Sequence, residues 1–146
     1  MNAQQAVNIV MIEDDEGHAR LIEKNIRRAG IANGLKHFTD GTSGLEYLFN
    51  SPDGPLHNGP ALVLLDLNLP DMSGTDILKK IKGDERLHRV PVVVLTTTDD
   101  KTEIERCYEL GCNVYIQKPV DYERFAEAIR RLGLFVPLVL LPEVTK

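Results

Sequence analysis

The sequence predicts an α/β fold in which one parallel sheet of five strands is covered by helices on both faces. Five short apolar runs alternate with segments whose apolar residues recur every three or four positions, the spacing of an amphipathic helix. Such alternation is typical of parallel sheets. Two of the runs, 61–66 and 91–96, are apolar almost throughout, as doubly covered strands require. Right-handed crossovers leave few topologies, and we expect the doubly wound, flavodoxin-like strand order 2-1-3-4-5 with five helices.

Strand and helix follow one another in turn along the chain. The predicted strands are 8–12, the weaker 35–38, 61–66, 91–96 and 113–117. The apolar positions that mark the helices are Ala19, Ile22, Ile26 and Ala29; Leu45, Leu48 and Phe49; Ile77, Leu78 and Ile81; Ile104, Cys107 and Leu110; and Phe125, Ala128, Ile129 and Leu132. Gly30, Gly111 and Gly133 are expected to end three of these helices. The segment 51–60, with three prolines and two glycines, predicts a loop longer than usual.

Length and composition predict a single globular domain. The chain has 146 residues, of which 42% are hydrophobic and 27% charged, ordinary values for such a domain. We expect the domain to occupy 1–133 and an apolar C-terminal extension, 134–146, to follow it with no separate output domain. No run reaches the ~18 apolar residues of a membrane helix, and the N-terminus has no secretory signal pattern, so we expect a cytoplasmic protein.

Charge and cysteine content exclude further classes. The net charge of −5 argues against nucleic-acid binding, which needs a basic face. Cys107 and Cys112 form neither a disulfide framework nor a zinc motif, and we expect reduced, partly buried thiols.

Polar side chains of complementary chemistry follow four of the five predicted strands. They are Glu13, Asp14 and Asp15 after the first strand, Asp66 at the end of the third, Thr96 and Thr97 at the end of the fourth, and Lys118 after the fifth. Each has an ordinary structural explanation by itself, such as a helix cap. Because the carboxyl ends of parallel strands share one edge of the sheet, we expect these groups to meet at one ligand site.

This combination predicts a site that accepts a phosphoryl group. Clustered carboxylates are tolerable when a hard cation joins them, and Mg²⁺ prefers oxygen ligands. A carboxylate beside Mg²⁺ can attack phosphorus and form an aspartyl phosphate, and Asp66 is the candidate. A lysine and a hydroxyl would stabilise charge on the transferring oxygens. The chain has no glycine-rich nucleotide motif, so the phosphoryl donor is expected to be something other than a bound nucleoside triphosphate.

The sequence resembles the response-regulator receiver domains of two-component signalling. The resemblance spans about 8–132 and is carried by the segments IVMIEDDE, LVLLDLNLPDMSG, PVVVLTT and YIQKP. Spacings of 30 residues from Asp66 to Thr96 and 22 from Thr96 to Lys118 match the family pattern. The resemblance implies a signalling module rather than an enzyme, with at most slow self-dephosphorylation. It would take its phosphoryl group from a cognate histidine kinase and signal through phosphorylation-dependent protein–protein interaction.

The resemblance also implies a role for each site residue. Asp66 would be the phosphoacceptor; Glu13, Asp14, Asp66 and the backbone carbonyl of Asn68 would hold Mg²⁺; Thr96, Thr97 and Lys118 would contact the phosphoryl group; Thr96 and Tyr115 would form a switch; and a cis peptide would precede Pro119. Counting back from Gly30 places Glu13 and Asp14 in register with the family's acidic pair, which makes Asp14 the direct metal ligand. Asp15 remains a competitor, since the acidic triplet is ambiguous by one residue.

Three features depart from the common receiver pattern. Thr97 stands where the family more often has alanine, the loop 51–60 is long, and the apolar extension follows the last helix. In these features the sequence resembles the single-domain regulators paired with bacterial phytochromes, so a phytochrome kinase is a candidate partner. Because monomers rarely leave an apolar strip exposed, the extension would either fold back on its own domain or cover a partner. We expect the second, a homodimer built on the last two helices, the last strand and the extension.

Two other functions are compatible with these residues. One is a phosphorelay intermediate that passes its phosphoryl group to a histidine phosphotransfer protein. The other, more remote, is a Mg²⁺-dependent aspartyl-phosphate phosphatase, which needs a carboxylate two residues after the nucleophile where this chain has Asn68. The four histidines, His18, His37, His57 and His88, are expected to be surface residues.

Overall fold

The computed structural model describes residues 7–30, 32–52, 54 and 61–132. Its elements are β1 (Val7–Ile12), α1 (Glu16–Ala29), β2 (Ala32–Phe38), α2 (Gly41–Asn50), β3 (Ala61–Asp66), α3 (Gly74–Lys82), β4 (Val92–Thr96), α4 (Lys101–Glu109), β5 (Val114–Gln117) and α5 (Tyr122–Arg131). The five strands form one parallel sheet in the order β2-β1-β3-β4-β5. The predicted fold class and strand order are therefore confirmed.

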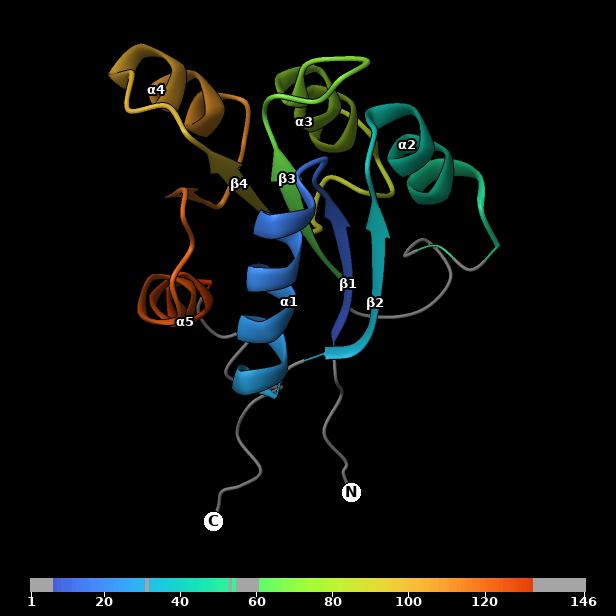
Figure 1. Ribbon diagram of the computed structural model, residues 1–146. Coiled ribbons are helices and arrows are strands. Elements are labelled where there is room, and N and C mark those ends of the chain that lie inside the picture. Colours follow the sequence, from blue (N-terminus) through green and yellow to red (C-terminus); the bar gives the residue numbers. More distant parts are fainter. Residues whose placement is uncertain (1–6, 31, 53, 55–60, 133–146) are drawn as a thin grey trace.

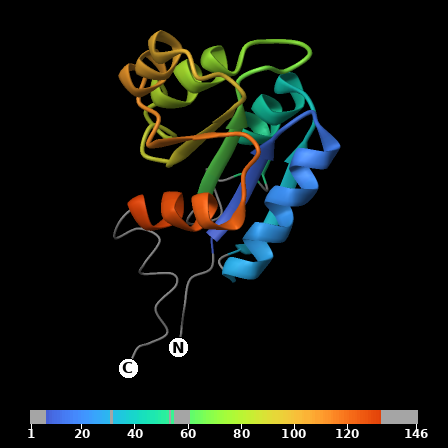
Figure 2. The same ribbon diagram turned by 60° about the vertical axis from the view of Figure 1, so that its left-hand side comes forward.

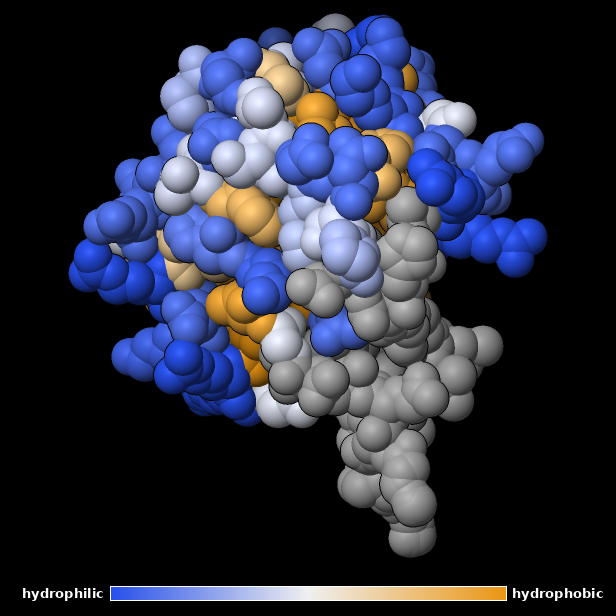
Figure 3. All heavy atoms as spheres, turned by 90° about the vertical axis from the view of Figure 1, so that its right-hand side faces the viewer, coloured by the Kyte–Doolittle hydropathy of each residue, from blue (hydrophilic) through white to orange (hydrophobic). Residues whose placement is uncertain are grey.

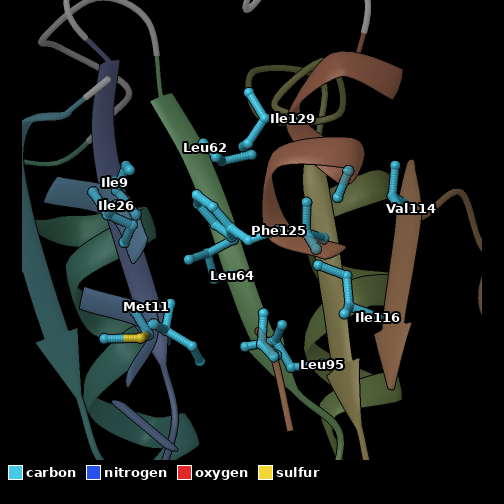
Figure 4. Packing of buried hydrophobic residues seen from close by; sticks show 14 of the residues in the cluster. Ile9, Met11, Ile26, Leu62, Leu64, Leu95, Val114, Ile116, Phe125 and Ile129 are labelled. Atoms are coloured by element: carbon cyan, nitrogen blue, oxygen red, sulfur yellow. The ribbon is translucent and has the colours of Figure 1, made fainter. Parts of the chain in front are cut away.

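The sheet is the middle of three layers (Figures 1 and 2). Helices α1 and α5 cover one face, and α2, α3 and α4 cover the other. Successive residues of β1 serve the two faces in turn: Ile9 and Met11 pack with α1 and α5, whereas Val10 and Ile12 pack with the other three helices. Figure 4 shows the first of these cores, with Phe125 of α5 lying over β3. Every residue of β3 and β4 is buried, as their apolar sequences require.

Polar residues cap the helices where the sequence enters them from the strands. The N-caps are Asp15 for α1, Asp40 for α2, Ser73 for α3, Asp100 for α4 and Asp121 for α5. Each side chain accepts a hydrogen bond from a backbone N–H of the first turn, which would otherwise lack a partner. Gly30 ends α1 in the left-handed conformation, with φ 68°, as its position predicts.

The structure adjusts several predicted boundaries. Strand β2 begins at Ala32 instead of residue 35, because its backbone pairs with β1 through the stretch that has weak strand propensity.

Cys107 and Cys112 are free and buried, where partly buried thiols were expected. Gly133, the extension 134–146 and most of the loop 51–60 lie outside the described residues.

The edge of the sheet formed by β2 is polar. Viewed from the side of β2 and α2, the molecule is mainly hydrophilic, with small and separate hydrophobic areas (Figure 3). Gly34, Lys36, His37 and Thr39 on this side are exposed. None of the helices in the described part of the chain is long and apolar enough to cross a bilayer.

Candidate functional site

The strand register brings the predicted site residues to one edge of the sheet. Asp66, the last residue of β3, stands opposite Leu95, the residue before Thr96 on β4. Thr96 in turn stands opposite Gln117 on β5, the residue before Lys118. Glu13 directly follows β1, the neighbour of β3 on its other side. Four segments that are distant in sequence therefore end beside one another.

Three carboxylates meet at this edge. One oxygen each of Glu13, Asp14 and Asp66 lies within 4.8 Å of the others, an arrangement that could hold a metal ion. Glu13 and Asp66 are buried, with 0% and 2% of their surface exposed, whereas Asp14 is exposed. A set made only of carboxylate oxygens suits a hard cation such as Mg²⁺, which also keeps several waters. The open side at Asp14 leaves room for such waters.

Lys118 supplies the positive charge of the cluster. Its Nζ lies 2.7 Å from Oε1 of Glu13 and 3.3 Å from Oδ1 of Asp66, and only 5% of its side chain is exposed. The backbone N–H of Asp15 donates to Oε2 of Glu13 at 3.0 Å, whereas Oε1 has the ion pair with Lys118 and no hydrogen bond. Three acids facing one lysine leave the cluster with an excess of negative charge, which a divalent cation would neutralise.

Burial and like charge raise the pKa of two of the carboxyls. The pKa of Asp66 is raised chiefly by desolvation and then by the charge of Glu13, while Asn68 and Lys118 oppose the shift. The pKa of Asp14 is raised by partial desolvation and by its contact with Asp66. Perturbed carboxyls of this kind cluster at functional sites.

Asp15 caps helix α1, unlike the two acids that precede it. Its Oδ1 accepts the backbone N–H of His18 at 2.9 Å and so caps α1, and this hydrogen bond holds the pKa of Asp15 below its usual value. The acidic triplet is thus divided in space: Asp14 joins Glu13 and Asp66, and Asp15 belongs to the helix. Local patterns leave this division open, because either aspartate can cap a helix, whereas the register with the receiver family favours Asp14 as the metal ligand.

The loop after β3 forms the wall beside the carboxylates. The backbone N–H of Asn68 donates to Oδ1 of Asp66 at 3.2 Å, and Asn68 pairs with Ser73 across the loop in an antiparallel bridge. Gly74 passes so close that a Cβ there would lie 2.3 Å from the backbone oxygen of Asp66. An open hollow of about 510 Å³ lies between this loop, 67–73, and Asp14.

The remaining predicted residues lie at the ends of β4 and β5 or, in the case of Tyr115, within β5. Thr96 is buried, and its hydroxyl oxygen accepts the backbone N–H of Thr98 at 3.0 Å. Thr97 is exposed, and the Lys118–Pro119 peptide bond is cis. Tyr115 is half-buried on β5 and meets Tyr108 of α4 edge to face, with ring centres 5.8 Å apart. The structure thus places Tyr115 against α4 and not in the carboxylate cluster.

Two residues outside the predicted set connect the loops of the site to the end of β2 and the start of α2. Nε2 of His37 lies 2.8 Å from the backbone oxygen of Glu13, and the Asp71 carboxylate accepts the backbone N–H groups of Gly41 and Thr42. No sequence signal could have found either contact, since the partners are 24 and about 30 residues apart.

A doubly wound sheet with three carboxylates and a lysine gathered at its carboxyl edge is typical of the phosphoacceptor domains of signalling proteins. The family model described as response regulator receiver domain matches residues 9–130. The chain therefore belongs to the response regulator receiver domain family, and the resemblance found in the sequence is confirmed.

Similar proteins of known structure include regulators linked to phytochromes. The chain is 64% identical to a response regulator receiver domain from Rhodospirillum rubrum, with a TM-score of 0.71 over 88% of this chain and 92% of that one. It is 32% identical to the bacteriophytochrome response regulator RtBRR, with a TM-score of 0.78 over 89% and 80% of the two chains.

A third relative is the response regulator Rcp1 of Synechocystis. The two sequences are 34% identical over 135 residues, 92% of each chain. A solved structure of Rcp1 is an Mn²⁺-bound form, with a TM-score of 0.72 over 94% of this chain and 99% of that one.

Proposed function

We propose that the chain is a response regulator whose receiver domain accepts a phosphoryl group from a histidine kinase on Asp66. The observation that carries the proposal is the meeting of Glu13, Asp14 and Asp66 with Lys118 at one edge of the sheet. The open hollow is lined by Asp14 and by the loop 67–73 that directly follows Asp66. A donor that enters this hollow would lie next to Asp66, whereas Oε1 of Glu13 is paired with Lys118.

The transfer is a displacement at phosphorus. A carboxylate oxygen of Asp66 attacks the phosphorus of a phosphohistidine, the P–O bond forms, the P–N bond breaks, and the imidazole leaves with a proton. Bound Mg²⁺ would neutralise charge on the transferring oxygens. Lys118, which already contacts Asp66 at 3.3 Å, would donate to one of those oxygens, and the hydroxyls of Thr96 and Thr97 would donate to others.

We assign the Mg²⁺ ligands as Asp14, Asp66 and the backbone carbonyl of Asn68. Glu13 lies behind these ligands, where its carboxylate forms an ion pair with Lys118. With Asn68 two residues after Asp66, the site has no carboxylate in the place where a phosphohydrolase of the aspartyl-phosphate type needs its general acid. We therefore propose a phosphoacceptor that dephosphorylates itself slowly. We also propose that it acts in the cytoplasm.

The output is proposed to be a change in protein–protein contact at the face made by α4, β5 and α5. Movement of Thr96 toward a phosphoryl group would free space for Tyr115, whose ring now packs on Tyr108 of α4. This face, extended by residues 134–146, is the proposed homodimer surface. Similarity to RtBRR supports a phytochrome kinase as the cognate donor.

A transfer assay tests the function. A phosphorylated histidine kinase should pass its label to the wild-type chain in Mg²⁺, as an acyl phosphate that hydroxylamine removes. Asp66→Asn should abolish the label, whereas Asp84→Asn, which changes a capping carboxylate after α3, should leave it unchanged. Labelling of Asp66→Asn at the wild-type rate would refute the assignment.

A further inference from the structure

The segment 37–42, which runs from the end of β2 to the start of α2, contacts both loops that carry the acids of the site. From these contacts we infer that His37 and Asp71 are positioning residues that hold the two loops of the metal site, one from each side. The inference rests on the proposed function, and it concerns how well this chain binds Mg²⁺ instead of which residue is phosphorylated.

The end of β2 holds the backbone of Glu13 at two points. The N–H of Glu13 donates to the backbone oxygen of Phe38 at 2.9 Å, and Nε2 of His37 donates to the backbone oxygen of Glu13 at 2.8 Å. The first contact is available to any residue at position 38. The second depends on the imidazole of His37, which is otherwise an exposed side chain on the outer strand of the sheet.

Asp71 fastens the other loop to the start of α2. Its two oxygens accept the backbone N–H groups of Gly41 and Thr42, each at 2.8 Å, and the hydroxyl of Thr42. These bonds hold the pKa of Asp71 down at about 2, so the carboxylate stays charged at neutral pH. The helix already has its own cap in Asp40, whose side chain accepts the N–H of Ser43. Asp71 is therefore a second acid on the same helix N-terminus, supplied by the loop of the site.

Packing reinforces the same junction. A Cβ at Gly41 would lie 2.4 Å from Cγ of Met72, so the loop tip rests directly on the backbone of α2. The tip is coupled to the site, because Asn68 and Ser73 bridge the base of the loop and the N–H of Asn68 donates to Asp66. A loop released at Asp71 would lose the restraint on Asn68 and on the oxygen that the proposed function assigns to Mg²⁺.

Calorimetric Mg²⁺ titration of the full chain tests the inference. We expect Asp71→Ala and His37→Ala each to weaken Mg²⁺ binding by about tenfold, the lower end of what residues behind metal ligands contribute. At saturating Mg²⁺ the labelling of Asp66 should return to near the wild-type rate, because both residues hold the loops and neither touches the phosphoryl group. Adding Thr42→Val to Asp71→Ala should weaken binding little further, since the two side chains form one contact.

Matched controls separate positioning from general loss of stability. Asp84→Ala removes another capping carboxylate, and His88→Ala another exposed histidine whose ring contacts backbone oxygens, both beyond the far end of α3. These variants should bind Mg²⁺ as the wild type does. Equal weakening in the controls, or wild-type affinity in the His37 and Asp71 variants, would overturn the inference. A wild-type chain that neither binds Mg²⁺ nor accepts a phosphoryl group would instead refute the proposed function.

Discussion

Replacing Lys118 by methionine should destabilise the metal-free protein strongly and the Mg²⁺-bound protein much less. Methionine is an unbranched side chain one atom shorter than lysine, and it carries no charge. The change leaves Glu13 and Asp66, which are almost fully buried, facing Asp14 with no compensating cation. A buried charge that loses its partner keeps its desolvation penalty without the attraction that offset it.

The distances allow the size of the effect to be worked out. At an effective dielectric constant of about 20, the contacts of Nζ with Glu13 and Asp66 at 2.7 and 3.3 Å correspond to gross attractions of about 6 and about 5 kcal/mol. Desolvation of Lys118 opposes most of this attraction. Asp66, whose pKa is already raised, can also take up a proton when the lysine is lost. We therefore expect a loss of about 3–5 kcal/mol in the free energy of unfolding, the range for a broken buried pair.

Urea unfolding followed by circular dichroism measures this loss in EDTA and in saturating Mg²⁺. In Mg²⁺ the cation replaces the missing positive charge, so the loss should shrink by at least half. Lys24→Met, which alters an exposed lysine on α1, is the control and should change neither value. A loss below about 1 kcal/mol in EDTA, the range of exposed ion pairs, would refute the reasoning about burial. An equal loss with and without Mg²⁺ would refute the reasoning about the cation.

Three further predictions concern the pH dependence and two buried contacts. Because the folded protein raises the pKa of Asp14 and Asp66 above 3.8, these two groups bind more protons in the folded than in the unfolded chain between their raised pKa values and 3.8. Their contribution to the free energy of unfolding in EDTA should therefore rise as pH falls toward 3.8, while Mg²⁺ affinity falls, and urea titrations should show the wild type gaining stability relative to Asp66→Asn over this range. Gly74→Ala should cost about 1–3 kcal/mol in urea unfolding, because its Cβ meets the backbone oxygen of Asp66, and stability equal to wild type would contradict this close approach. Asn25→Ala should cost about 1–3 kcal/mol, because the backbone oxygen of Val120 loses its 2.8 Å hydrogen bond from the buried amide, and an unchanged melting temperature would show that this bond is dispensable.

The architecture could be predicted because it depends on patterns that each segment carries by itself. The runs 61–66 and 92–96 are apolar at every position but the last, and this alone places them inside a doubly covered sheet. The edge strand β2 is harder to predict from the sequence. Its residues Gly34, Lys36 and His37 belong to a polar, exposed surface, and its pairing with β1 comes from the backbone. Its first residues were missed for that reason.

The gathering of the site residues was predictable because parallel strands deliver their carboxyl ends to one edge. What each residue does there depends on contacts across many residues of sequence. Lys118 reaches Glu13 from the opposite end of the chain, and Asp71 reaches Gly41 from a different loop. The different positions of Asp14 and Asp15, between which only the register with the receiver family gave a preference, depend on the backbone at the start of α1. Such contacts are fixed by tertiary packing, and local patterns do not encode them.

Mapping the phosphorylated residue tests the central claim most directly. The chain is phosphorylated by its kinase in Mg²⁺, the acyl phosphate is reduced with borohydride, and peptide mass spectrometry locates the resulting homoserine. The account predicts homoserine at position 66, in a yield that EDTA abolishes and that Asp15→Ala leaves nearly unchanged. Modification at Asp14 or Asp15, or modification of Asp66 that proceeds equally in EDTA, would contradict it.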